Sequence, residues 1–505
     1  MQKNIKLSLI LVAFLSSLHA DNQYTLETID VTSSQGTTLN KKDVTDSVTV
    51  ITKEALEESR VTTLNEALNQ LGGISMTQNG STGSTSSMYV RGMDSGSILV
   101  LIDGIRYNDP TNSSGAAQFS QIMLYNVEQI EIIKGSQSGV WGSDATGGVI
   151  NIVTSKAKKG LHGVLKTEYG SYNSIQTSLQ TSYATDKYDV LVSGLSYSTD
   201  GFSSAEPKQG DSDYGNRYDE LGWEQDAYIN KSFNAKFGYN INEKDRIEAS
   251  VQSIDSTVNY DYAGTDSLTN QNSIRNRFFS ASYKHKDSLN DIKLSYNYSS
   301  LKREYSYGDY DGSVNELKID NKISYMKDGF LKVGASKQDV KFDNATTAGE
   351  DKEYTALSAF TTNYNKTKLF KNLNTIITES IRYDSYDDFD NSITGKLGVK
   401  QFIYKDYYIS ANAGTGYKAP TLYQLYGYYG STDLNPEKSI TSDITLGNDT
   451  IWLTGFYNEI TDAIEWESSG YYNTSGKSKF KGIELGYKDY FLNSLGVDAM
   501  YTYLE

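Results

Sequence analysis

The sequence of 505 residues combines few apolar residues (37%) with 12% aromatic residues, and its formal net charge is −16 at pH 7. This excess of carboxylates argues against nucleic acid as a partner, and the aromatic content argues against a disordered chain. The absence of cysteine excludes a disulfide framework and cysteine-based metal sites. With 41 tyrosines, 42 glycines and 4 prolines, the composition favours many antiparallel strands with tyrosines at membrane interfaces.

Residues 1–20 have the pattern of a cleaved export signal. Lys3 and Lys6 form a positive start, the apolar run LSLILVAFLSSL is too short for a spanning helix, and Ala20 offers a small residue at the cut. Removal of this segment takes away two basic residues, so the mature chain is more acidic still. Acidic loops that hold divalent cations are one interpretation, and an ordinary solvated acidic surface is the other.

Between Val48 and about Thr154 the sequence is typical of a small mixed domain. SVTVIT predicts a strand, and TTLNEALNQLGG predicts a helix that starts with a capping box of Thr63 and Glu66 and stops at its two glycines. The apolar run Ile98–Ile102, closed by an Asp-Gly turn, predicts a strand buried on both faces. We expect it to be the central strand of a compact module.

After about Gly160 apolar and polar residues alternate. DIKLSYNYS is an example, and RIEASVQS, LKVGAS and YYISANAG repeat it. Since no apolar run of about 18 residues follows the signal, spanning helices are excluded. Strands of about ten residues with alternately short and long connections indicate an outer-membrane barrel. A soluble sandwich of many strands is the alternative.

Two long stretches resemble TonB-dependent outer-membrane receptors. The first runs from Arg91 through LVLIDGIRYN, VEQIEIIKG and WGSDATGGVINIVT and is similar to the plug of that family. The second, GTGYKAPTLYQLYGYYGSTDLNPEKS at residues 414–439, is similar to the family's barrel, most closely to its cobalamin (BtuB-type) branch. The resemblance implies a transporter rather than an enzyme, in the outer membrane of a Gram-negative bacterium, surrounded by lipid and monomeric.

The fold implied by the resemblance is an all-β transmembrane barrel of the 22-stranded type with an N-terminal α/β plug domain in its lumen. It divides the chain into a signal peptide (1–20), a TonB box with a flexible linker (21–45), the plug (46–158) and the barrel (159–505). One departure is Ser136, where the family usually has proline. We also expect the sequence to be C-terminally incomplete, because MYTYLE corresponds to a strand well before the end of the family barrel and an open barrel leaves unpaired edges in lipid.

The segment LETIDVTSS precedes the plug and resembles the TonB box, which pairs with TonB by strand addition. A periplasmic partner is needed because the outer membrane has neither ATP nor a sustained ion gradient. The predicted TonB box consists of Leu26, Glu27, Thr28, Ile29, Asp30, Val31 and Thr32.

Two loops, NGSTGSTSS and YNDPTNSSG, lie at the plug apex by resemblance and face an external pocket. The positions that match cobalamin contacts of the branch are Thr85, Ser86, Asn112 and Ser113, with Tyr260 as a ligand-facing aromatic residue. Small hydroxyl and amide groups suit a ligand rimmed with amides. Plain turn chemistry is the alternative, since these residue types dominate loops.

Calcium is a second expectation from the resemblance. Asp211, Asp213 and Asp261 match loop carboxylates that hold calcium and order the cobalamin site. Hard divalent cations prefer several oxygen ligands.

The sequence leaves few alternatives to a cobalamin receptor. Haem uptake commonly uses histidine, whereas His162 and His285 occupy the domain boundary and a predicted turn. A ferric-siderophore receptor shares the plug, the TonB box and most barrel motifs, so it is the alternative function. A barrel hydrolase would need a histidine paired with a nucleophile, which neither histidine's surroundings suggest.

Two basic residues, Arg91 in MYVRG and Lys134 in EIIKG, end apolar strands of the plug and therefore need partners at a barrel wall. By resemblance these partners are Asp443 and Glu484. Because Lys134 and Asp443 replace the family's usual arginine and glutamate, we expect a looser network that is still paired. Charges exposed to water are the alternative.

Overall fold

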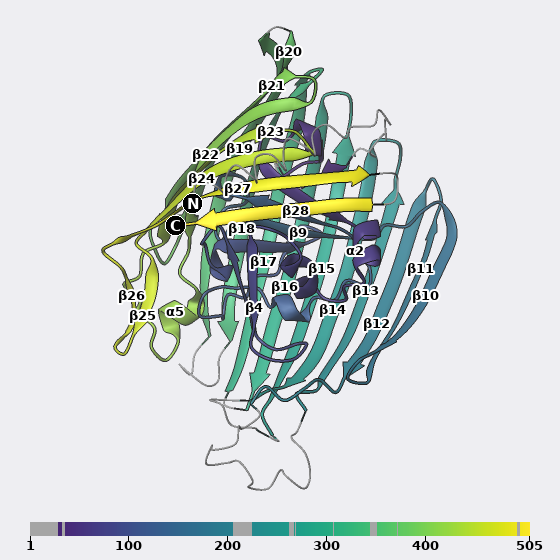
Figure 1. The fold of residues 1–505 in the computed structure, drawn as a ribbon, viewed down its shortest axis with the longest axis vertical. Coiled ribbons are helices and arrows are strands. Elements are labelled where there is room, and N and C mark those ends of the chain that lie inside the picture. Colours follow the sequence, from purple (N-terminus) through teal and green to yellow (C-terminus); the bar gives the residue numbers. More distant parts are fainter. Residues whose placement is uncertain are drawn as a thin grey trace, which may run out of the picture.

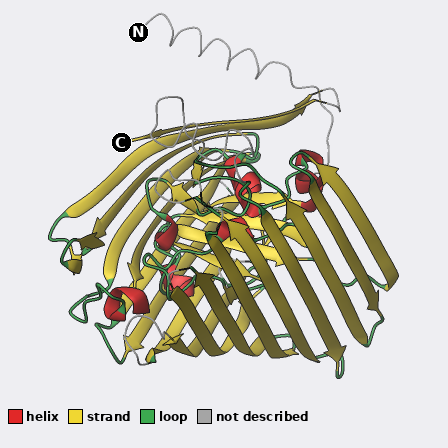
Figure 2. Cartoon of the chain, turned by 90° about the horizontal axis from the view of Figure 1, so that it is seen from below, coloured by secondary structure: helices red, strands yellow, loops and turns green. Residues whose placement is uncertain are grey.

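The computed structural model describes residues 29–32, 36–205, 225–261, 267, 269–306, 308–343, 351–370, 372–491 and 495–505. Two bodies make up this part of the chain: a large curved antiparallel sheet and a smaller mixed domain that lies against its concave face (Figures 1 and 2). None of the helices in the described part is long and apolar enough to cross a membrane.

The large sheet contains 17 strands, and each pairs with the next along the chain apart from one interruption by a hairpin. The strands are β10 (Gly160–Gly170), β11 (Ser174–Ala184), β12 (Tyr188–Thr199), β13 (Tyr228–Asn240), β14 (Asp245–Asn259), β15 (Gln271–Lys286), β16 (Asn290–Tyr305), β17 (Gly308–Met326), β18 (Gly329–Asp343), β19 (Lys352–Phe370), β20 (Leu373–Tyr386), β21 (Ser392–Tyr404), β22 (Tyr407–Lys418), β23 (Glu437–Gly447), β24 (Ile451–Thr461), β27 (Lys477–Phe491) and β28 (Leu495–Leu504). The hairpin β25 (Ile464–Glu467) and β26 (Gly470–Asn473) lies between β24 and β27.

The sheet has its apolar side chains on the outside and its polar side chains on the inside. In β16, Leu294 and Tyr296 are 43% and 39% exposed, whereas Ser295 and Ser299 are buried against the plug side. This arrangement suits a wall with lipid outside and a polar lumen. The predicted alternation is therefore confirmed.

The predicted strand length of about ten residues is too short. The strands contain 10 residues in β28 and up to 19 in β17 and β19. In β17 the exposed apolar pair Leu317 and Ile319 lies in the second half, and the first half is largely polar. Hydrophobic alternation identifies only the band that lipid would contact, because the strands continue beyond it.

Connections alternate between the two ends of the sheet. At one end, the short-turn rim, residues 185–187, 241–244, 287–289 and 405–406 join neighbouring strands. At the other end, the long-loop rim, the connections include residues 200–227, 260–270, 419–436 and 462–476. The predicted alternation of short and long connections is confirmed in most places, and the exceptions at the long-loop rim are the short connections 171–173 and 306–307.

The smaller domain is built on a five-stranded sheet with the order β3-β8-β9-β6-β7. These strands are β3 (Ser47–Thr52), β8 (Val127–Lys134), β9 (Gly148–Thr154), β6 (Ile98–Ile102) and β7 (Ile105–Arg106). A separate hairpin joins β4 (Ile74–Gln78) and β5 (Ser86–Val90), and β1 (Asp30–Val31) pairs with β2 (Leu39–Asn40). The helices are α2 (Lys53–Ser59), α3 (Leu64–Asn69) and α4 (Ser138–Trp141), with 3-10 turns η1 (Lys41–Asp43), η2 (Ser95–Ser97) and η3 (Phe119–Gln121), while α5 (Leu422–Tyr426) belongs to the long-loop rim.

Strand β6 is buried on both faces, as its apolar run predicts. Ile98, Val100 and Ile102 belong to the main plug core, and Leu99 and Leu101 pack on the other face. It is not the central strand, however, because β9 occupies that position. The Asp103-Gly104 turn, with φ of +52° and +85°, folds the chain back into the two-residue β7, which covers the outer edge of β6.

Helix α3 begins with the predicted capping box. The Thr63 hydroxyl accepts a hydrogen bond from the Glu66 N–H, and the Glu66 carboxylate accepts one from the Thr63 N–H. The helix ends at Asn69, before the predicted glycines. Gly73 instead packs against Lys134, where an added Cβ would lie 2.5 Å from the Lys134 Nζ atom.

The core of the small domain continues into the wall of the large sheet. Ile254, Phe278 and Leu301 from β14, β15 and β16 belong to the same buried cluster as Val100 and Ile150. Figure 2 shows the small domain enclosed on its sides by the curved sheet. The domain is therefore a plug that is packed against one sector of the wall.

Candidate functional site

Four charged side chains join the plug to the wall. Arg91, which follows β5, donates from Nη2 to Glu484 at 2.8 Å, from Nε to Glu484 at 3.3 Å, and from Nη1 to Asp443 at 3.2 Å. The Lys134 Nζ atom, at the end of β8, lies 2.9 Å from Glu484. The structure thus brings together all four residues predicted for the latch.

The latch excludes water almost completely, because each of its four residues is at most 5% exposed. Burial lowers the pKa of Lys134, although the charge of Glu484 acts in the opposite direction. Burial also acts to lower the pKa of Arg91, but the carboxylates of Glu484 and Asp443 outweigh it and raise this pKa. Lys134 pairs with the Glu484 carboxylate, whereas the planar guanidinium of Arg91 binds the carboxylates of both Glu484 and Asp443.

Ser136, the departure from the family's usual proline, lies beside the latch. Its N–H donates to the Thr441 hydroxyl at 2.9 Å, and its own hydroxyl donates to the Thr415 carbonyl at 2.9 Å. Proline could make neither bond, because it has no N–H and no hydroxyl. The substitution therefore adds two contacts between plug and wall.

The described part of the predicted TonB box lies docked on the plug. Val31 is fully buried beside Val44 and Ile133. The N–H and the hydroxyl of Thr32 both donate to the Glu131 carboxylate at 2.9 Å. Leu26, Glu27 and Thr28 lie outside the described residues, as does the predicted signal peptide.

The two predicted apex loops of the plug both face the long-loop rim. The Ser81 hydroxyl donates to the Asp226 carbonyl, and the Pro110 carbonyl accepts from the Leu422 N–H. Thr85 and Ser113 are exposed. The other two predicted contact residues are occupied by local bonds.

Ser86 donates weakly to Asn65 at 3.4 Å. The side-chain oxygen of Asn112 accepts from the N–H and the hydroxyl of Ser114 at 2.9 and 3.0 Å. Asn112 therefore stabilises its own turn, as the alternative interpretation of these loops predicts.

A chain of five tyrosines crosses the long-loop rim beside the second apex loop. Its successive ring centroids, in the order Tyr260, Tyr305, Tyr310, Tyr423 and Tyr471, are 6.5, 6.0, 5.9 and 6.2 Å apart. Sequence reasoning singled out only the first of them. The tyrosine clusters YSYGDY, at the connection between β16 and β17, and YQLYGYYG, in the connection 419–436, were the available signal.

This tyrosine chain is connected to the plug at one end and in the middle. Tyr471 forms a side-chain hydrogen bond with Ser113, and burial raises the pKa of Tyr471. In the middle of the chain, the Arg303 guanidinium lies 4.8 Å from the Tyr310 ring, and its Nε atom lies 2.7 Å from the buried Asp109 carboxylate. A molecule bound on the tyrosines would therefore touch groups that also hold the plug apex.

Of the three predicted calcium ligands, only Asp261 belongs to the described residues; Asp211 and Asp213 lie outside them. The Asp261 carboxylate accepts hydrogen bonds from the N–H groups of Ser204, Ala205 and Ser267 at 3.1, 2.9 and 2.9 Å. Within the described ranges no three histidine, cysteine or acidic side chains are grouped as a metal site requires. Asp261 joins two connections of the long-loop rim in the structure.

The large sheet is apolar on its outer face and polar on its inner face, and a separately folded plug fills it. These features define an outer-membrane receptor in which a plug domain occupies a β-barrel. Two family profiles match the chain: the TonB-dependent Receptor Plug Domain over residues 40–149, and the TonB dependent receptor-like beta-barrel over residues 165–505. The chain belongs to the TonB-dependent receptors. As such it is a transporter and not an enzyme.

Solved structures share this fold. The siderophore receptor PirA from Acinetobacter baumannii matches with a TM-score of 0.76 and 17% identity, over 90% of this chain and 80% of that one. A variant of the ferric enterobactin receptor PfeA from Pseudomonas aeruginosa matches with a TM-score of 0.75 and 17% identity, over 90% and 79% of the two chains. At such identities the likeness concerns the fold.

The latch is expected to stabilise the plug cooperatively. We expect Glu484→Gln or Arg91→Gln to lower the free energy of plug unfolding by about 3–5 kcal/mol, because each leaves a buried charge without its partner. The measurement is denaturant unfolding of both single variants and the double variant in detergent. Lys438→Gln, which removes an exposed pair with Asp462, is the control and should cost about 0–1 kcal/mol. Additive, near-zero effects at Arg91 and Glu484 would show that the latch does not stabilise the plug.

Proposed function

We propose that this receptor imports cobalamin or a related corrinoid across the outer membrane of a Gram-negative bacterium, with energy supplied by TonB. The observation that carries this proposal is the surface of the long-loop rim, where tyrosines and the exposed hydroxyls of Thr85 and Ser113 lie at the plug apex. Flat aromatic faces and neutral hydrogen-bonding groups suit a large ring system rimmed with amides.

The charge of the rim supports a ligand that is not strongly anionic. The connection 200–227 contains eight acidic and two basic residues, and YDDFDN at residues 386–391 adds three aspartates. A concentration of like charge repels an anionic ligand on approach. Ferric catecholates carry several negative charges, so this rim disfavours them more than it disfavours a corrinoid.

A ferric-siderophore receptor is the second candidate. It is supported by the structural neighbours, whose names describe a siderophore receptor and a ferric enterobactin receptor. A ferric hydroxamate of neutral or positive charge would agree with the acidic rim as well.

Ligand binding to the purified protein separates these candidates. We expect cyanocobalamin to bind more tightly than a ferric catecholate or a ferric hydroxamate in calorimetric titrations. Tyr423→Ala should weaken that binding about tenfold, because truncating a central aromatic contact costs about 1–2 kcal/mol. Tyr296→Ala, on the outer face of β16, is the matched control and should bind normally. Tighter binding of either iron complex would contradict the assignment of cobalamin and favour a ferric siderophore as the ligand.

Energy coupling through the predicted TonB box gives a separate prediction. Ile29→Pro should abolish uptake and leave ligand binding near normal, because proline removes a backbone donor needed for strand addition. Ile29→Ala keeps that donor and is the control. Uptake of radiolabelled ligand by cells and binding by the purified variants are the two measurements. Undiminished uptake by Ile29→Pro would refute the assignment.

Calcium is proposed to order the long-loop rim through Asp211, Asp213 and Asp261. We expect chelation to weaken ligand binding and added calcium to restore it, since the ion would cancel repulsion between these carboxylates. In the Asp211→Asn/Asp213→Asn variant binding should no longer respond to calcium. Asp186→Asn, at the short-turn rim, is the control. Affinity that is the same with and without chelator would contradict this proposal.

A further inference from the structure

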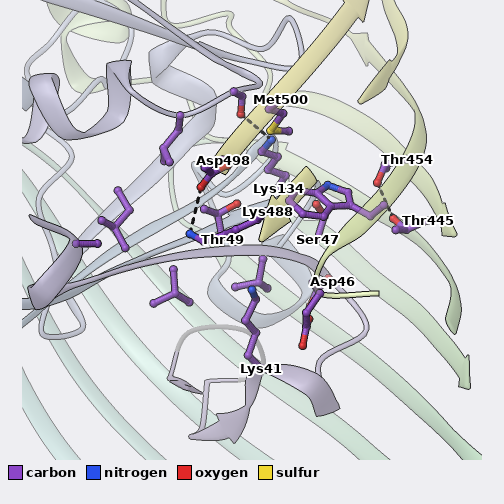
Figure 3. Close-up of a pocket in the computed structure, with 18 of the residues that line it drawn as sticks. Lys41, Asp46, Ser47, Thr49, Lys134, Thr445, Thr454, Lys488, Asp498 and Met500 are labelled. Atoms are coloured by element: carbon purple, nitrogen blue, oxygen red, sulfur yellow. Dashed lines mark hydrogen bonds and ion pairs between the residues drawn. The ribbon is translucent and has the colours of Figure 1, made fainter. Parts of the chain in front are cut away.

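Cavities lie on both faces of the wall, and they differ in chemistry. The inner cavity, between plug and wall, has a volume of about 640 Å³ and is lined by charged side chains such as Lys41, Lys488 and Asp498 (Figure 3). The outer cavity, called the outer groove here, has a volume of about 700 Å³ and lies on the outside of β21 to β24. Because its lining is mainly apolar and lipid surrounds this face, it suits an aliphatic chain rather than a polar ligand.

The outer groove combines small residues with large apolar ones. Ala411 and Gly455 are the small residues, and Leu397, Ile444 and Leu453 are large and exposed. An added Cβ at Gly455 would meet no atom within 4 Å. The space above this glycine is therefore open from the outside of the wall.

A row of three lysines follows the outer groove in the direction of the long-loop rim. On β27, Ile483 pairs with Gly455 of the groove, and the next three outward positions are Lys481, Lys479 and Lys477. In the order Lys477, Lys479 and Lys481, their side chains are 57%, 59% and 60% exposed. Successive outward residues of a strand lie about 7 Å apart, so these ammonium groups repel one another unless an anion lies among them.

Carboxylates neutralise this lysine row only in part. The Glu459 carboxylate lies 2.6 Å from the Lys477 Nζ atom and 3.9 Å from that of Lys479, and the Lys481 Nζ atom lies 3.2 Å from Glu505. Within ion-pair distance, the described residues thus offer two carboxylates to three ammonium groups. Each ammonium group has three donors, so further donors are available to a second anion.

Strand β18 shows a different pattern of outward charges. Lys337, Asp339, Lys341 and Asp343 alternate in sign along the same side of this strand, and Lys337 lies 2.9 Å from Asp339. A row of this kind is neutral by itself. The row on β27 has one sign only, and of the two rows it is the one that adjoins the outer groove.

We propose that the outer groove and the row Lys477, Lys479 and Lys481 together bind one phosphorylated lipid of the outer leaflet, with an acyl chain in the groove and the phosphate on the lysines. Long connections of such barrels lie outside the cell, so the groove lies deeper in the membrane than the lysines, as acyl chains lie deeper than headgroups. Lysine binds phosphate as a point charge. The lipid covers the outside of β23 and β27, whose inner sides carry Asp443 and Glu484 of the latch.

Binding of defined lipids to the full chain in neutral detergent tests this proposal and needs no transported ligand. The probes are dimyristoyl phosphatidic acid, dimyristoylglycerol, which has the same chains without phosphate, and inorganic phosphate, which has no chain. In native mass spectra we expect one phosphatidic acid to be retained and the diacylglycerol to bind at least about tenfold more weakly. Equal binding of the diacylglycerol, or displacement of phosphatidic acid by an equal concentration of inorganic phosphate, would overturn the proposal.

Removal of two lysines tests the phosphate contact. Lys479→Gln/Lys481→Gln should weaken retention of phosphatidic acid at least about tenfold, because two of the three ammonium groups around the phosphate are lost. Lys337→Gln/Lys341→Gln makes the same change of charge on the outside of β18 and should bind normally. An equal loss in both double variants would reveal a general attraction between charges and would overturn the site.

Filling of the outer groove tests the acyl-chain contact. Gly455→Leu has room for its side chain and should weaken retention at least about tenfold, because the acyl chain loses its buried contacts. Gly163→Leu on β10, where the nearest atom to an added Cβ is 3.9 Å away, is the control. Circular dichroism of both variants verifies that the wall has folded. Unchanged retention by folded Gly455→Leu would also overturn the proposal.

Discussion

The contact between Glu484 and the two plug cations Arg91 and Lys134 is the interaction on which the plugged barrel depends. Lys134 is the last residue of β8, and Arg91 directly follows β5. Both bind Glu484 on strand β27 of the wall, and all three side chains are buried. A charge in such a place is stable only while its partners are present, because each ion has lost its hydration. Separation of plug and wall at these three residues is therefore disfavoured.

This interface differs in kind from the interior of the plug. Ile98, Val100 and Ile150 form an apolar core that reaches the wall at one sector, β14 to β16, while other parts of the surface between plug and wall contain hydroxyl, amide and charged groups such as Ser136 and Asn412. Polar contacts can be exchanged for water with a small net change in free energy, whereas an exposed apolar core cannot. The plug can thus loosen from part of the wall and keep its own core, a property that transport through a filled barrel requires.

The sequence predicted those features that leave a local pattern. The buried strand Ile98–Ile102, the capping box at Thr63 and the two kinds of connections are each visible in a few consecutive residues. The latch residues Arg91 and Lys134 could be recognised because a cation at the end of an apolar strand needs a partner, and the family resemblance pointed to that partner on a distant strand. The prediction that Ile98–Ile102 is the central strand of the plug sheet was wrong. The parallel pairing of β6 with β9 joins residues about 50 positions apart, and no local pattern indicates it.

Two other features could not be assigned from such local patterns. Among 41 tyrosines, Tyr305 and Tyr310 resemble the tyrosines that face lipid, because they too belong to long strands, β16 and β17. Lys332, Lys366, Lys396 and Lys400 each occupy a polar position of a strand and would be interpreted singly as solvated charges of the lumen. All four bind the segment of residues 36–46, which is about 290 to 360 residues away in the chain. Only folding of the whole wall around the plug brings them together.

The long-loop rim and the middle of the wall are connected through the plug by polar contacts. At the long-loop rim, Arg303 stacks on Tyr310 and binds Asp109 of the apex loop. In the middle of the wall, Asn412 binds both the Thr45 carbonyl and the latch residue Asp443. Between these points lies the continuous sheet of the plug, in which β6 leads from the apex side and β9 and β8 lead to Lys134. Tyr310, Arg303, the plug sheet and Lys134 are thus parts of one packed body, and such an interior has little free space in which one part could move without its neighbours.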